Sequence, residues 1–199
     1  SISGRRTYAD ALLQPMIALF TTMEGITDKV NAGYYFYDLN GKLTHRFSDK
    51  SRLFLSVYDG DDVVYAKIRT MNTDVQSQWL NFDNDWGNLV ASARWNYELS
   101  PKLFMNVTGA YTRYRNGIDV DYETVMRGQT GEDETSDFVM KYHSGIRDWT
   151  AKVDFDYAPS PDHSVKYGFS AINHTFSPEV ASTTLNYFDE NYMNNSINL

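Results

Sequence analysis

Alternation between apolar and polar residues is the feature that most constrains how this chain can fold. Between Tyr35 and Phe47 the odd positions are mostly apolar, while the even positions carry Asp38, Lys42 and Arg46. The stretch 149–157 repeats the pattern. Because successive side chains of a strand point to opposite faces, each stretch predicts a strand with one apolar and one charged face. A face with charges of both signs does not pack in a dry core, so we expect these strands to separate an apolar phase from water.

Six runs of this kind follow one another along the chain. The predicted strands are 34–47, 52–59, 88–99, 103–113, 148–157 and 164–176. Short connections are expected at 48–51, 100–102 and 158–163, and long loops at 60–87 and 114–147. Short turns at one end and long loops at the other are typical of outer-membrane barrels. The prediction is an all-β, antiparallel up-and-down meander that forms part of a transmembrane outer-membrane β-barrel.

The two ends predict a piece of a larger barrel. Residues 1–8 resemble the inside of a strand and bring the total to about seven strands. Residues 11–20, broken by Gln14 and Pro15, predict a loop or short surface helix, since a membrane-spanning helix needs about 18 apolar residues. The polar, Asn-rich stretch 191–199 predicts no closing strand. We therefore expect residues 1–199 to be a partial barrel domain, with the remaining strands elsewhere.

The apolar face divides into an aliphatic band between two aromatic girdles, as at the two surfaces of a bilayer. One girdle comprises Tyr35, Tyr37, Tyr111 and Trp149, and the other comprises Phe47, Tyr97, Phe155, Tyr157 and Tyr167. The band comprises Leu39, Leu43, Leu53, Leu55, Val57, Ala91, Ala93, Val107, Val153 and Ala171. The opposite, lumenal face carries Asp38, Lys42, Arg46, Arg52, Arg94, Glu98, Asp148, Lys152, Asp154, Asp156 and Lys166.

Charge and composition exclude several classes of function. The formal net charge is −8, and the acidic residues gather in the predicted loops, which argues against a nucleic-acid partner. There is no cysteine, so neither a disulfide framework nor a thiolate metal site can form. The four histidines are scattered, and no phosphate loop or nucleophile motif occurs. We expect no catalytic residues and no cofactor, and hence no enzyme.

The predicted long loops hold the candidate binding residues. Flat aromatic rings beside carboxylates suit a sugar or another amphipathic ligand, and the candidates are Trp79, Phe82, Asp83, Asp85 and Trp86. A weaker hypothesis is a divalent ion, since hard cations prefer oxygen ligands; its candidates are Asp59, Asp61 and Asp62. Packing of the aromatic residues onto the barrel rim, or a solvated acidic surface, would account for the same residues.

The stretches Ser1–Leu13 and Tyr34–Asp62 resemble TonB-dependent outer-membrane receptors, most closely the SusC-like branch with a carboxypeptidase-regulatory-like domain. This resemblance implies a barrel of 22 strands plugged by an N-terminal domain, energised through TonB. The expected function is binding and import of a scarce nutrient, such as a glycan or metal chelate, in the bacterial outer membrane. Expected partners are membrane lipid, TonB and the plug domain, and the sequence does not decide whether a surface lipoprotein also binds. A passive porin-like barrel and a soluble secreted β-rich binding module stay open as alternatives.

Overall fold

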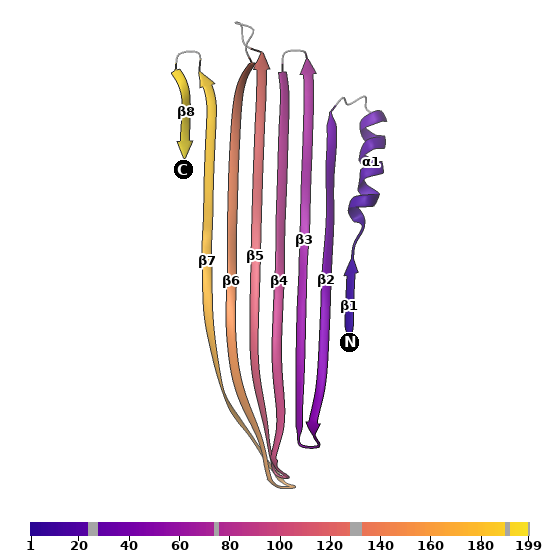
Figure 1. Cartoon of the computed structure of the whole chain (residues 1–199), viewed down its shortest axis with the longest axis vertical. Coiled ribbons are helices and arrows are strands. Elements are labelled where there is room, and N and C mark those ends of the chain that lie inside the picture. Colours follow the sequence, from indigo (N-terminus) through magenta and orange to yellow (C-terminus); the bar gives the residue numbers. More distant parts are fainter. Residues whose placement is uncertain (24–27, 74–75, 128–132, 190–191, 199) are drawn as a thin grey trace.

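The computed structural model describes all residues of the chain except 24–27, 74–75, 128–132, 190–191 and 199. One sheet takes up most of these residues, with its strands side by side in chain order (Figure 1). The elements are β1 (Ile2–Arg6), α1 (Ala9–Met23), β2 (Lys29–Ser48), β3 (Ser51–Thr73), β4 (Gln76–Ser100), β5 (Leu103–Arg127), β6 (Asp133–Ser160), β7 (His163–Asp189) and β8 (Tyr192–Asn198).

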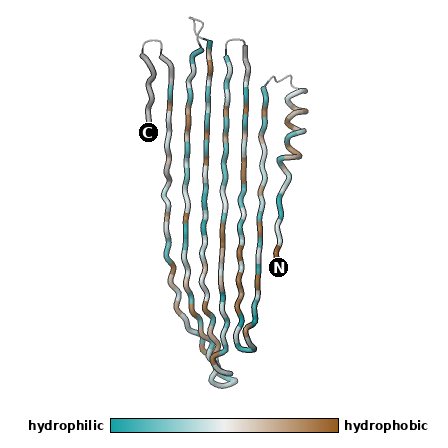
Figure 2. The backbone as a smooth tube through the Cα atoms, viewed as in Figure 1, coloured by the Kyte–Doolittle hydropathy of each residue, from teal (hydrophilic) through white to brown (hydrophobic). Residues whose placement is uncertain are grey.

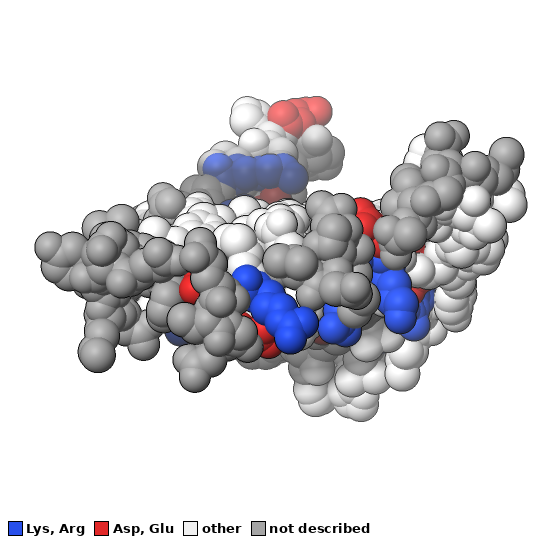
Figure 3. All heavy atoms as spheres, turned by 90° about the horizontal axis from the view of Figure 1, so that it is seen from above, with Lys and Arg blue, Asp and Glu red and all other residues white. Residues whose placement is uncertain are grey.

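The sheet is an antiparallel up-and-down meander, which confirms the predicted fold class. The predicted strand 34–47 pairs with 52–59, 88–99 with 103–113, and 148–157 with 164–176. The short turns that join these pairs lie together at the lower end of the sheet in Figure 1. In the described part of the chain β1 and β8 each pair with one neighbour only, so the sheet is an open curved wall, seen end-on in Figure 3.

The prediction of two long loops is wrong. Residues 60–87 and 114–147 are mostly strand, and they form the upper parts of β3, β4, β5 and β6. Only two residues separate β3 from β4, and five separate β5 from β6. A strand of 25 residues such as β5 extends for roughly 80 Å, whereas crossing a bilayer needs only about 9–11 residues. Strands of this length that crossed a bilayer would therefore leave much of the sheet outside it in any orientation.

The ends of the chain agree with the predictions in part. The N-terminal stretch forms β1 as expected, and residues 11–20 lie within a helix, α1. The stretch after residue 191 contains a strand that was not predicted, β8, which makes eight strands in place of about seven. Among the described residues β8 pairs with β7 alone, so it does not close a barrel. None of the described helices is both long and apolar enough to span a membrane.

Helix α1 lies against the edge of β2 through its polar side. The Gln14 side chain donates hydrogen bonds to the side-chain oxygen of Asn31, at 2.6 Å, and to the carbonyl of Ala32, at 2.8 Å. The apolar residues of the helix are exposed instead: Leu12, Met16, Leu19 and Phe20. This helix is held by hydrogen bonds, and its apolar stripe has no cover among the described residues.

The strand register divides the sheet into two faces. Directly opposed residues of neighbouring strands share a face, and one such row runs Leu43, Leu55, Ala93, Gly109, Ala151 and Ala171. We call this the outer face, and we call the face with Lys42 and Arg94 the inner face because a hollow of about 730 Å³ lies against it. The predicted aliphatic band and lumenal residues separate onto these two faces as expected.

The outer face is uncovered. Leu43 is 59% exposed, Trp149 63% and Phe169 78%, and no apolar side chain of the described residues is buried. Apolar patches of this extent on a monomer mark a surface that another phase or partner covers. The sheet has no hydrophobic core of its own, as expected for a wall whose outer face meets lipid.

The polarity of both faces reverses partway up the strands. We define the lower sheet as residues 38–48, 51–60, 88–100, 103–114 and 146–160, and the upper sheet as 29–37, 61–70, 76–87, 115–127 and 133–145. In the upper sheet the outer face is charged, with Lys67, Arg69, Asp83, Asp119, Asp121, Glu123 and Lys141. The inner face there is largely apolar. Figure 2 shows hydrophobic and hydrophilic residues alternating along both parts of the strands.

Arginine substitutions in the lower sheet test the sidedness. We expect Ala93→Arg to destabilise the protein by about 2–4 kcal/mol in lipid, because it places a charge in the middle of the apolar band. The neighbouring Ser92→Arg change should cost far less, since Ser92 lies on the inner face, where its hydroxyl is 2.8 Å from that of Ser56. The measurement is denaturant-induced unfolding after refolding into vesicles, and equal losses for the two variants would contradict the assignment of faces.

Candidate ligand-binding surface

The inner face of the upper sheet is the best candidate for a binding surface. Its residues come from five neighbouring strands and are mostly apolar or aromatic. They are Val30, Ala32, Tyr34, Val64, Ala66, Ile68, Leu80, Phe82, Ile118, Val120, Tyr122, Phe138, Met140 and Tyr142. We call this set the inner apolar wall. The outer face at the same height is charged, as expected for a surface in contact with water. An apolar inner face in such a region is the kind of surface that a ligand or a protein partner covers.

Three successive inner positions of β4 combine aromatic and amide groups. Phe82, Asn84 and Trp86 alternate along the strand and point to the same face. The side-chain oxygen of Asn84 is buried and has no hydrogen-bond partner within the described residues. A buried acceptor without a partner costs about 1–3 kcal/mol, which a ligand hydroxyl or amide could recover. Rings that flank such an amide suit an amphipathic ligand.

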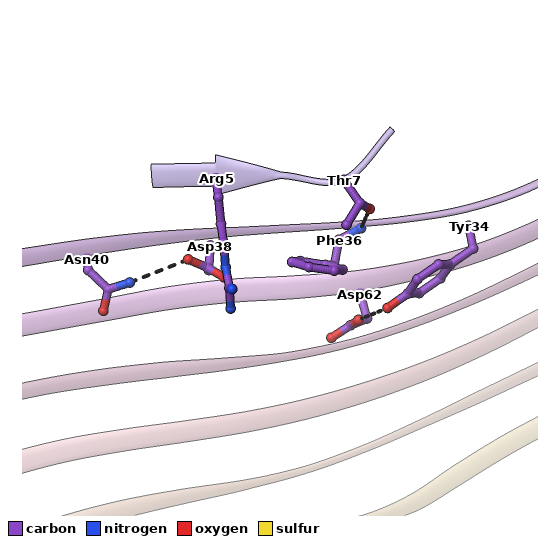
Figure 4. A network of polar contacts seen from close by, with 7 residues as sticks. All are labelled: Arg5, Thr7, Tyr34, Phe36, Asp38, Asn40 and Asp62. Carbon is purple, nitrogen blue, oxygen red and sulfur yellow. Dashed lines mark hydrogen bonds and ion pairs between the residues drawn. The ribbon is translucent and has the colours of Figure 1, made fainter. Parts of the chain in front are cut away.

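A polar network borders the inner apolar wall from below (Figure 4). The hydroxyl of Tyr34 donates a hydrogen bond of 2.5 Å to Asp62 on β3. This hydrogen bond raises the pKa of Tyr34 above its ordinary value, because ionisation would place two negative charges together. Arg5 of β1 contacts Asp38 at 2.5 Å, and the Asn40 amide lies 3.4 Å from the same carboxyl. The network joins β1, β2 and β3 where the inner face changes from polar to apolar.

A second network lies on the outer face, where the polarity reverses. Asp61 is 7% exposed and accepts a hydrogen bond from the Tyr37 hydroxyl. Its carboxyl reaches across Gly87 of β4 to the guanidinium of Arg115 on β5, at 2.8 Å. Arg115 also lies 3.9 Å from Asp85. The hydrogen bond to Asp61 raises the pKa of Arg115, because it stabilises the protonated guanidinium.

The five predicted ligand-binding residues do not form one cluster. Phe82 and Trp86 lie on the inner face, whereas Trp79, Asp83 and Asp85 lie on the outer face. These residues are close in sequence, but on a strand successive side chains point to opposite faces. The prediction of a loop at 60–87 could not reveal this separation. Ligand contact by Phe82 and Trp86 stays a prediction. The apolar inner face around these two residues suits an amphipathic ligand better than the outer face around Trp79, Asp83 and Asp85 does.

The weak metal candidates also separate. Asp59 and Asp61 point outward and Asp62 points inward. Asp61 is engaged by Arg115, and Asp62 by Tyr34. Within the described ranges no group of three or more potential ligands could hold a metal ion.

The histidines lie in four separate places. His174 contacts Asp148 at 2.8 Å and His163 contacts Ser160 at 2.9 Å, while His143 lies 3.7 Å from Asp119. His45 stacks edge-on against Phe47 on the outer face. Each contact joins a histidine to a residue of its own strand or of an adjacent strand, as expected for structural pairs within a sheet.

The inner face of the lower sheet differs in character from the wall above it. The hollow of about 730 Å³ is lined by Lys42, Ser56, Ser92, Arg94, Lys152 and Asp154, among others. Lys152 pairs with Asp154 at 2.9 Å and Lys166 with Asp156 at 3.0 Å. Groups of both signs at this height suit contact with water or with a polar protein surface.

The sequence analysis did not predict most residues of the inner apolar wall. A usable signal exists: Val64, Ala66 and Ile68 alternate with charged or aromatic residues, as do Leu80 and Phe82. The alternation is out of phase with the aliphatic band, since even positions carry the apolar residues. A search for period-two alternation that allowed the phase to change would have found these strands.

Comparisons with known proteins give only weak matches, all of them to solved structures. No family model matches the chain, and no curated protein matches it. Among solved structures, the outer-membrane transporter YddB from Escherichia coli has 7% identity over 83% of this chain, with a TM-score of 0.17. The chain spans 35% of the length of that protein. The KdgM porin has 15% identity over 78% of this chain and 92% of its own, with a TM-score of 0.13. LpxR from Salmonella typhimurium has 7% identity over 98% of this chain and 95% of its own, with a TM-score of 0.13.

Two glycines of the outer face give a matched test of the Asp61 network. A Cβ at Gly87 would overlap the Asp61 carboxylate, whereas a Cβ at Gly109 would meet nothing within 4 Å. We expect Gly87→Ala to cost about 1–3 kcal/mol, because it displaces the carboxylate from Tyr37 and Arg115. Gly109→Ala should be neutral or slightly stabilising. Unfolding in lipid vesicles measures both, and similar stabilities would show that the network contributes little.

Proposed function

We propose that this chain is barrel wall of a bacterial outer-membrane receptor of the TonB-dependent kind, which binds a scarce amphipathic nutrient and imports it. The observation that carries the proposal is the reversal of polarity along the strands. The lower sheet has an apolar outer face and a polar inner face, which suits a wall between lipid and a watery lumen. The upper sheet has a charged outer face and an apolar inner wall, which suits a ligand vestibule above the membrane.

The resemblance to SusC-like receptors in the sequence supports the receptor part of this proposal. In such a receptor the polar inner face of the lower sheet would lie against the plug domain, and TonB would supply the energy. The chain acts by binding and passage in this account and carries out no catalysis. Glycans fit the inner wall well, since sugar rings pair an apolar face with a rim of hydroxyls that Asn84 and the tyrosines could contact.

A passive porin is the second candidate. The charged, open hollow against the lower inner face favours it, because a water-filled channel needs a lining of this kind. The two candidates differ in their need for energy, since a receptor of the TonB-dependent kind stops importing when TonB is removed and a porin does not.

Two tryptophans of β4 separate ligand binding from a general effect on the barrel. We expect Trp86→Ala to lower uptake of a limiting nutrient about tenfold, because it removes an aromatic ring of the inner face that borders the inner apolar wall. Trp79→Ala removes a ring that is 49% exposed on the outer face, and it should leave uptake unchanged. Growth on a panel of glycans as the only carbon source is the measurement, with protein levels in the outer membrane as the control.

The same growth experiment in a strain without TonB tests the energised mechanism. Loss of growth in that strain would support the receptor, whereas growth that persists would favour the porin. If Trp86→Ala and Trp79→Ala have equal effects, the inner wall is not the binding surface.

A further inference from the structure

Two arginines oppose each other directly on the outer face. Arg113 of β5 and Arg147 of β6 are cross-strand partners, so their side chains leave the sheet on the same side. Like charges at directly opposed positions destabilise a sheet, because the Cβ atoms are only about 4.5–5.5 Å apart. Such a pair needs a compensating anion or a location where repulsion is screened.

No carboxylate of the described residues compensates these two arginines. Neither arginine side chain forms a hydrogen bond or an ion pair with another described residue. Their other cross-strand neighbours are Leu89 and Thr175, which are uncharged. The nearby carboxylates are engaged elsewhere or displaced: Asp61 and Asp85 lie against Arg115, Asp148 contacts His174 from the inner face, and Asp59 is two strands from Arg113.

The arginine pair lies at the upper edge of the apolar band. The next outer-face pair below it is Tyr111 and Trp149, whose ring centroids are 4.7 Å apart. Aromatic side chains of this kind prefer the boundary between hydrocarbon and headgroups. Two residues further along a strand correspond to about 6.6 Å, so the guanidinium groups lie at headgroup height.

A hollow adjoins the pair. It has a volume of about 310 Å³, and both cationic and apolar groups border it: Arg113, Arg115, Arg147, His143, Ser144, Ser177, Tyr114, Gly145, Ile146 and Pro178. The guanidinium groups of Arg113 and Arg147 border this hollow, and guanidinium groups bind oxyanions.

We propose that Arg113 and Arg147 bind the phosphate of a phosphorylated lipid headgroup in the outer leaflet of the membrane. Guanidinium groups bind phosphate oxygens through two parallel hydrogen bonds, and one phosphate between the arginines would turn their repulsion into a shared attraction. The inference rests on the proposed function, since it requires the apolar band to lie in an outer membrane.

A lipid titration tests this site. The full-length protein in maltoside micelles is titrated with fluorescent diphosphoryl lipid A. We expect Arg113→Gln and Arg147→Gln each to weaken binding about fivefold, and the double variant about 25-fold. Arg113→Lys, which keeps the charge but loses the paired hydrogen bonds, should fall between wild type and Arg113→Gln. Arg69→Gln, an equal loss of charge higher on the same face, should bind as wild type does.

Competitors and stability distinguish the alternatives. Dephosphorylated lipid A and millimolar inorganic phosphate should not displace the probe; displacement by phosphate would show a site for the free ion and overturn the lipid assignment. Without lipid A, the melting temperature of each Gln variant should equal or exceed that of wild type, because one member of a repelling pair is gone. Wild-type affinity in the double variant would overturn the proposal.

Failure of this site can be told apart from failure of the proposed function. If the chain does not span a membrane, Ala93→Arg and Ser92→Arg refold into vesicles equally well. If it does span one but the arginines bind no lipid, those two variants differ while the titration is unaffected by the Arg113 and Arg147 changes.

Discussion

Hydrogen bonding between neighbouring main chains is the interaction on which everything else in this molecule depends. Each strand from β3 to β6 pairs with two neighbours over most of its length, and no apolar side chain of the described residues is buried. A sheet of this kind satisfies its polar backbone but leaves its apolar side chains without cover. Lipid is the medium that covers such side chains without competing for the backbone hydrogen bonds. In the proposed membrane setting, lipid would supply the hydrophobic stabilisation that a folded interior supplies in a soluble protein.

The reversal of polarity shows that one continuous strand serves two environments. Along β4, apolar residues point outward at Ala93 and inward at Phe82, with no break in pairing between them. A soluble sandwich would keep one apolar face throughout, because its core lies on one side only. The networks around Asp61 and Asp62 lie close to the reversal, where neither face is apolar enough to exclude them. Polar side chains there tie neighbouring strands together at the point where the side-chain pattern changes.

The lower sheet could be predicted from the sequence almost completely. Strict period-two alternation fixes both the strand and its sidedness, so the hairpins and the aliphatic band followed from residues such as Leu43 and Val153. The upper sheet could not be predicted in the same way. Asp83 and Asp85 occupy the odd positions, which carry apolar residues in the lower sheet, so this stretch resembles a loop unless the alternation is allowed to change phase. Strand pairing brings Arg113 opposite Arg147, 34 positions further along the chain, and only the register reveals that juxtaposition.

In the membrane of the proposed receptor, the reversal would also fix how deeply the protein sits. On β5 and β6 the outer face changes from Tyr111 and Trp149 to Arg113 and Arg147 within two residues. A shift toward the lower end would draw the arginines into hydrocarbon, at a cost that rises to about 2–4 kcal/mol for each near the midplane. A shift the other way would lift the tryptophan and the aliphatic band into water. In such a membrane the wall would have a single vertical position, and the inner apolar wall would be held at a constant height above the membrane surface.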